Sequence, residues 1–223
     1  MIRPASLALA ATLGLVAAVA CSDIVSPTRT GLSYDWRLLL NYDSAGIPLQ
    51  DTLSFHWPRS SLPVKVWVED QNGLPDHIRT AIATWKAAFL YGEWDAKVVS
   101  DSAIADVIVR AIQPPPQSSS LRYALAEACI GATDVDTVAN RHQLRVPVHA
   151  YVYVSIPGDP RLEECLNTVA THELGHTMGL LQHSRDSTDI MYAVPTADAL
   201  TASDVATVVN AYHFKATMVP VRP

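Results

Sequence analysis

One segment, residues 171–184, constrains the fold more than any other part of the chain, because it reads Thr-His-Glu-Leu-Gly-His-Thr-Met-Gly-Leu-Leu-Gln-His-Ser. His172 and His176 are four residues apart, and at 3.6 residues per turn a helix places both imidazoles on one face, where they can share a metal ion. Glu173 lies one step round that helix, so its carboxylate can reach a metal-activated water rather than the metal. The segment therefore predicts a helix with a metal site and a general base.

A third protein ligand is expected, because zinc, the natural occupant of an imidazole site with an open position, takes three such ligands in catalytic centres. No glutamate follows Glu173, and Cys165 would lie about 10.5 Å from His172 along the helix, which is too far. His183 is the strongest remaining candidate. For His183 to reach back, the helix must end and the chain reverse, and Gly179 can adopt the positive φ that such a reversal needs.

Two motifs carry a resemblance to a known family. His172-Glu173-x-x-His176-x-x-Gly179 with a following histidine resembles the zinc signature of the metzincins. Asp189-Ile190-Met191-Tyr192 resembles their Met-turn, whose methionine, here Met191, underlies the imidazoles. The order of expected strands and helices over roughly 150 residues is similar to that of the matrixin-like catalytic domain.

The chain departs from the family pattern at the third histidine. That histidine usually falls three residues after the glycine, where this chain has Gln182, and His183 stands one residue further on. Glutamine is a poor zinc ligand, so we expect a loop one residue longer that still delivers His183. Gln182 and Asp186 stay open as alternatives.

The resemblance implies a zinc-dependent metalloendopeptidase with one catalytic Zn²⁺ and a polypeptide substrate. In this interpretation His172, His176 and His183 hold the zinc, and Glu173 is the general base that activates a water on the metal. The alternative is an exported zinc-binding lipoprotein with a zincin fold that binds polypeptide or envelope components without cleaving them. An intact Glu173 argues against the alternative, because a binding protein has no need of a general base.

Periodicity outside this segment predicts an α/β (α+β) fold, in which a twisted mixed sheet packs with a long active-site helix and a C-terminal helix. Strands are expected at residues 62–68, 105–112 and 146–156. Helices are expected at about residues 76–91, 161–179 and 203–212. Residues 148–154 are the hypothesised upper edge of the substrate cleft, where an extended peptide could add as an antiparallel strand.

Length and charge exclude several other classes of protein. A chain of 223 residues, 49% of them hydrophobic and 17% charged, is long enough for one globular domain and too short for two large ones. Its net charge is −6 and no basic run occurs, so we expect no nucleic-acid partner. We expect a monomer.

The N-terminus has the features of an export signal. Arg3 precedes an uncharged run over residues 5–20, which is about the length of a signal-peptide apolar region. Ala18-Val19-Ala20-Cys21 resembles the bacterial lipobox, so residues 1–20 are expected to be a lipoprotein signal peptide and Cys21 a lipid anchor. The expected location is the cell envelope, the outer membrane in a diderm cell; an ordinary secretory signal with an incidental cysteine is the alternative. Residues 21–60 then form a tether and an initial strand, and residues 61–223 the peptidase domain.

The other two cysteines and a group of acids and histidines are weaker candidates for sites. Cys129 and Cys165 can form a disulfide in an oxidising envelope, or they can be two buried free thiols. The resemblance also directs attention to the stretch where matrixins hold structural Ca²⁺ or a second Zn²⁺. The candidate ligands in this stretch do not reproduce a known ligand set. We therefore interpret them as solvated charges in a loop and a histidine on the face of a strand. These candidates are Asp134, Asp136, His142 and His149.

Overall fold

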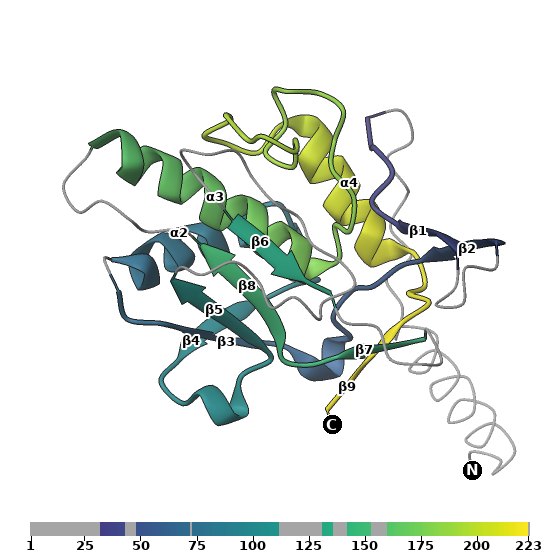
Figure 1. Ribbon diagram of the computed structural model, residues 1–223, viewed down its shortest axis with the longest axis horizontal. Helices are drawn as coiled ribbons and strands as arrows, with labels where there is room; N and C mark the ends of the chain where they lie inside the picture. The colour runs from purple at the N-terminus through teal and green to yellow at the C-terminus, as the bar shows by residue number, and fades with distance from the viewer. Residues whose placement is uncertain are drawn as a thin grey trace, which may run out of the picture.

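A mixed five-stranded sheet forms the centre of the protein, which we describe from a computed structural model. The structure describes residues 32–42, 48–71, 73–111, 131–135, 142–152 and 160–222. The strands lie in the order β4-β3-β5-β8-β6 (Figure 1). Their bounds are β3 Val64–Val68, β4 Ala96–Val99, β5 Val107–Ala111, β6 Gly131–Asp134 and β8 Val148–Val152.

The direction of the strands changes only at one edge of this sheet. β3 pairs in parallel with β4 and β5, and β5 pairs in parallel with β8, whereas β6 runs antiparallel to β8. Residues 148–152 therefore cannot take an added peptide strand, contrary to the hypothesis that an extended peptide adds along residues 148–154. β8 is an interior strand because β6, a four-residue strand that the periodicity did not predict, pairs along its other side.

Two helices cover one face of the sheet. α2 (Leu74–Ala87) lies against β3 and β4, α3 (Pro160–Met178) lies against β6 and β8, and the two helices pack on each other (Figure 1). The alternation of β3 buries Val64, Val66 and Val68 on this side. Trp85 of α2 is fully buried, and its indole N–H donates to the main-chain oxygen of Thr171 at 2.7 Å. The packing of α2 thus holds the middle of α3 in place.

The C-terminal helix α4 (Ala202–His213), which was expected at residues 203–212, begins with a capping box. The Thr201 hydroxyl accepts from the Asp204 N–H, and the Asp204 carboxylate accepts from the Thr201 N–H. The mixed sheet, the long helix and the C-terminal helix together confirm the predicted fold class.

The described part of residues 21–60 packs into the same core. Trp36, Leu38, Leu53, Phe55 and Trp57 are all at most 9% exposed and belong to the main hydrophobic cluster. The smaller elements are β1 Leu38–Tyr42, β2 Pro48–Leu53, η1 Arg59–Ser61, η2 Ser102–Ile104, β7 Gln143–Arg145 and β9 Val219–Val221. β1 pairs with β2 and β7 pairs with β9.

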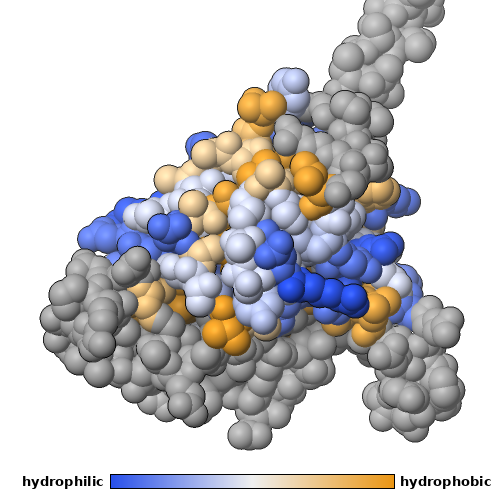
Figure 2. Space-filling view, turned by 90° about the horizontal axis from the view of Figure 1, so that it is seen from above, coloured by the Kyte–Doolittle hydropathy of each residue, from blue (hydrophilic) through white to orange (hydrophobic). Residues whose placement is uncertain are grey.

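The signal peptide, Cys21 and the first part of the expected tether lie outside the described residues, so these predictions stay predictions. Within the described ranges, no helix is both long and apolar enough to cross a membrane. Figure 2 shows hydrophilic and hydrophobic residues interspersed over the described part of the face seen from above.

Candidate metal centre

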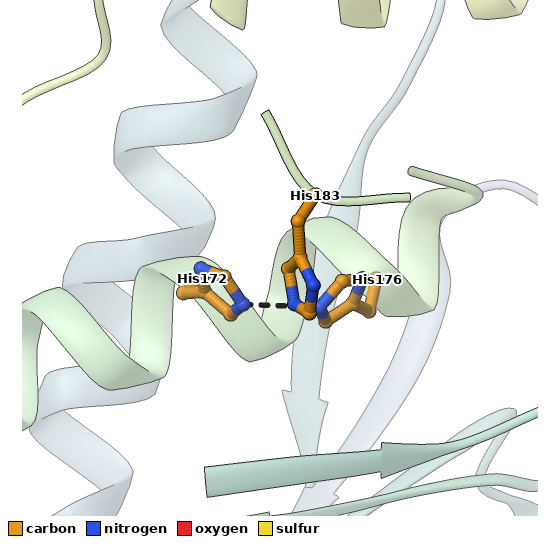
Figure 3. A group of neighbouring side chains, drawn as sticks. All are labelled: His172, His176 and His183. Atoms are coloured by element: carbon orange, nitrogen blue, oxygen red, sulfur yellow. Dashed lines mark hydrogen bonds between the residues drawn. The ribbon is translucent and has the colours of Figure 1, made fainter. Parts of the chain in front are cut away.

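Three imidazoles converge beside the C-terminal half of α3. His172 and His176 point from the helix, and His183 points back at them from the segment that follows it (Figure 3). One nitrogen from each ring lies within 4.8 Å of the others, and the Nε2 atoms of His172 and His176 are 3.0 Å apart. His172 and His176 are at most 1% exposed. This is the only cluster of potential metal-ligating side chains found among the described residues.

Backbone carbonyls orient the two helical imidazoles. Nδ1 of His172 lies 2.7 Å from the Ile190 oxygen, and Nδ1 of His176 lies 2.6 Å from the Leu180 oxygen. A carbonyl only accepts, so each Nδ1 carries the proton and donates it, and each Nε2 keeps its lone pair. The two Nε2 lone pairs face each other at 3.0 Å, an arrangement that a shared cation relieves.

The electrostatic environment keeps the three rings neutral. Burial lowers the pKa of His172 to about 3 and lowers the pKa of His176 well below its ordinary value. Burial also lowers the pKa of His183. Neutral imidazole nitrogens are donors that zinc prefers, so the chemistry of these three residues fits zinc.

A tight reversal after α3 brings His183 to the other two rings. Gly179 ends the helix with φ +113°, and a Cβ at this position would lie 1.9 Å from the main-chain oxygen of Phe55. The Gly179 N–H donates to the His176 oxygen at 3.0 Å. Gln182 is half-buried outside the cluster and Asp186 is exposed, so the structure places His183, rather than either alternative, next to His172 and His176.

Met191 lies directly beneath the helix that carries the imidazoles. It is fully buried, and its Sδ would be 2.5 Å from a Cβ added at Gly175. The absence of a side chain at Gly175 thus lets the methionine approach the backbone of α3. Met191 is held by its main-chain oxygen, which accepts from the Ser184 N–H at 2.8 Å.

A buried carboxylate from α4 supports the turn around Met191. Asp204 accepts from the Ile190 N–H at 2.9 Å, in addition to its bond to Thr201, and it is fully buried. Burial raises the pKa of Asp204, and the two N–H donors oppose that shift. Asp204 is thus both part of the helix cap and a support for the turn, and no local sequence pattern indicates its bond to Ile190.

Glu173 faces the sheet edge rather than solvent. Its side chain is 1% exposed, its Oε2 accepts from the Thr133 hydroxyl at 2.6 Å, and a Cβ at Gly131 would lie 2.4 Å from its Oε1. Burial raises the pKa of Glu173, and the bond from Thr133 opposes that rise. Thr133 and Gly131 had no signal in the sequence, because only the pairing of β6 brings them to α3.

The weaker candidates that the structure describes do not gather into a site of three or more ligands. Asp134 lies opposite His149 in the β6–β8 register, whereas His142 lies with its Nδ1 3.2 Å from the Thr217 oxygen. Burial lowers the pKa of His149, with a smaller contribution from the neighbouring Arg110 charge. Asp136 lies outside the described residues.

The predicted disulfide involves one described cysteine. Cys165 on α3 is half-buried and disulfide-bonded. Cys129 and Cys21 both lie outside the described residues, so the pairing of Cys129 with Cys165 stays a prediction.

A comparison with known families agrees with this geometry. The sequence model of the Matrixin family of peptidases matches residues 105–213, a range that includes β5, all three imidazoles, Met191 and α4. No curated protein matches the chain at a significant level.

Proposed function

We propose that this chain, which is a matrixin-like metzincin over residues 105–213, is a zinc-dependent endopeptidase in which Glu173 is the general base. The observation that carries the proposal is the cluster of neutral imidazoles from His172, His176 and His183, with a buried carboxylate one residue from the first of them. A buried carboxylate beside such a cluster is better suited to proton transfer than to stabilising the fold.

Zinc held by the three imidazoles would lower the pKa of the attacking water and polarise the scissile carbonyl. Glu173 accepts a proton from that water as the water oxygen bonds to the carbonyl carbon. The same carboxyl then donates the proton to the amide nitrogen as the C–N bond breaks, so the products are a carboxylic acid and an amine. The Nδ1 bonds of His172 and His176 keep both rings in one tautomer and orientation throughout.

The substrate is proposed to lie along β6. Among the described strands β6 pairs only with β8, so its other edge is the place where an extended polypeptide could add as a strand. Strand addition uses main-chain hydrogen bonds, so it selects an extended segment and favours unfolded chains and loops as substrates.

The central test uses purified protein with measured zinc content and a broad peptide library. We expect cleavage by the parent protein, and loss of cleavage in Glu173→Ala with one zinc per chain retained, because Glu173 is not a ligand. No cleavage by the zinc-loaded parent, or equal cleavage by both proteins, would refute the proposal. Stoichiometric zinc together with peptide binding but no cleavage would favour the non-cleaving binding protein instead.

The identity of the third ligand is tested separately. We expect His183→Ala to lose zinc at a chelator concentration that leaves Gln182→Ala loaded, because only His183 joins the imidazole cluster. Loss of zinc from Gln182→Ala alone would overturn the assignment.

We also propose that the protein is exported and anchored in the cell envelope by lipid on Cys21. Support comes from the uncharged run over residues 5–20 and the small residues before Cys21. Mass spectrometry of the mature N-terminus is the test: we expect a chain that begins at a lipid-modified Cys21, and an unmodified N-terminus would refute the anchor.

A further inference from the structure

A hydroxyl on the edge strand holds the carboxylate of Glu173. Thr133 of β6 is fully buried, and its Oγ1 lies 2.6 Å from Glu173 Oε2 and 3.2 Å from the Glu173 main-chain oxygen. A threonine hydroxyl has one proton to donate, and the shorter contact assigns that proton to the carboxylate. The 2.6 Å distance lies at the short end of the range for O–H···O hydrogen bonds.

The same strand makes room for the other carboxylate oxygen. Gly131 precedes Thr133 by two residues and therefore presents the same face of β6 to α3. A Cβ at Gly131 would lie 2.4 Å from Glu173 Oε1 and 2.7 Å from Glu173 Cγ. Any side chain at position 131 would thus displace the carboxylate from its present place.

The two oxygens of Glu173 consequently have different surroundings. Oε2 has a donor, whereas Oε1 is buried and accepts no hydrogen bond from the described residues. A buried oxygen without a donor is costly to a folded protein unless a ligand or a water serves it. The unsatisfied atom belongs to the group proposed as the general base, so its partner is expected during the reaction.

We propose that Thr133 is a positioning residue for Glu173, and that its bond to Oε2 leaves Oε1 as the oxygen that takes the proton from the attacking water. The inference rests on the proposed peptidase function. The water O–H bond breaks as its proton moves to Oε1, and the proton later passes from Oε1 to the amide nitrogen. Gly131 provides the space in which Oε1 stays correctly placed.

The test compares kcat, KM, zinc content and thermal unfolding for the zinc-loaded parent, Thr133→Val and Thr133→Ser. Thr133→Val keeps the shape and removes the donor, so we expect kcat to fall by about 10- to 100-fold. KM and zinc content should stay at the parent values. The substrate is proposed to bind the main chain of β6, whereas the side chain of Thr133 is buried against Glu173 of α3. Thr133→Ser keeps the hydroxyl and should recover most of kcat.

Thr207→Val is the matched control. Thr207 is also fully buried, and its hydroxyl donates to the Ser203 main-chain oxygen at 2.8 Å within α4. The substitution removes the same group from an equally buried site that does not touch Glu173. We expect a lowered melting temperature and a kcat within about twofold of the parent, which separates loss of stability from loss of positioning.

A second perturbation acts on the other oxygen. Gly131→Ala should lower kcat with zinc retained. If Thr133→Val fails to fold, this variant still tests whether β6 positions the carboxylate of Glu173. In a Glu173→Gln background, Thr133→Val should cause no further loss of residual rate, because residues that act as a unit are not additive.

The outcomes separate this inference from the function on which it rests. Full activity of Glu173→Ala would refute the peptidase mechanism itself. An inactive Glu173→Ala together with a Thr133→Val enzyme within twofold of the parent would overturn only the positioning role. Equal impairment of Thr133→Val and Thr133→Ser would also overturn it, because the hydroxyl would then not be the group that matters. An unchanged kcat in Gly131→Ala would also overturn the proposed positioning of Glu173.

Discussion

Gly179→Ala should disrupt the reversal on which the position of His183 depends. Two costs add at this residue. An alanine at φ +113° lies outside its allowed regions, which costs about 1–3 kcal/mol. Its Cβ would also lie 1.9 Å from the Phe55 main-chain oxygen, and ordinary contact requires about 3.5 Å, so two backbone segments must separate by more than 1 Å. We therefore expect the free energy of unfolding to fall by more than about 3 kcal/mol.

Gly92→Ala provides the matched control for the backbone conformation alone. Gly92 has φ +65°, and nothing lies within 4 Å of a Cβ at this position. This substitution should cost only about 1–2 kcal/mol, the penalty of a left-handed residue. The difference between the two variants measures the contact with Phe55.

The assay is urea unfolding of the metal-free proteins, because bound zinc would stabilise the native state by mass action and conceal part of the loss. Competition with a chelator then measures zinc affinity, which we expect to fall in Gly179→Ala and to stay at the parent value in Gly92→Ala. If Gly179→Ala were no less stable than Gly92→Ala and bound zinc equally well, the steric argument for the reversal would be wrong.

Three further predictions concern the surroundings of the imidazoles. Asp204→Asn puts an amide where the buried carboxylate accepts from Ile190 and Thr201, so the free energy of unfolding should fall by about 1–3 kcal/mol in urea titrations; an unchanged midpoint would contradict the role of that carboxylate. Gly175→Ala places a Cβ 2.5 Å from the Met191 Sδ, and a thermal melt should show a loss of about 1–3 kcal/mol, whereas a parent-like melt would mean that the thioether moves freely aside. Burial lowers the folded pKa of His172 from 6.5 to about 3, so the contribution of this ring to the stability of the metal-free protein should be complete above pH 6.5 and should be lost as pH falls toward 3; an equal change of the urea midpoint between pH 7.5 and 5 in the parent and in His172→Gln would contradict this.

Much of the imidazole site can be predicted from the sequence, because its geometry depends on residues that are close together in the chain. The separation of His172 and His176 is one helical turn, so any helix over these residues brings the two rings together. Gly179 follows the same logic, since a reversal immediately after a helix needs a positive φ and glycine adopts it without strain. Trp85, Ile78 and the alternating valines of β3 likewise follow their periodicity into the core.

The sequence did not predict β6, and a peptide was therefore expected to add along β8 instead, because the pairing of these two strands is not local. β6 has four residues, too few for an alternating pattern, and all of them are buried. Whether it lies beside β8 or elsewhere depends on main-chain hydrogen bonds between strands that are far apart in the chain, which leave no mark in either segment alone.

The sequence by itself determined the pair His172 and His176, the helix that carries both, the reversal at Gly179 and the class of fold. Only the tertiary structure decided what completes and surrounds that pair: His183 beside the two rings, Thr133 bonded to Glu173, and Asp204 beneath the turn of Met191. The physical reason is the separation along the chain over which each interaction acts. Helical spacing and backbone φ act over a few residues, whereas a buried carboxylate finds its partner only after strands and helices 14 to 40 residues apart have packed together.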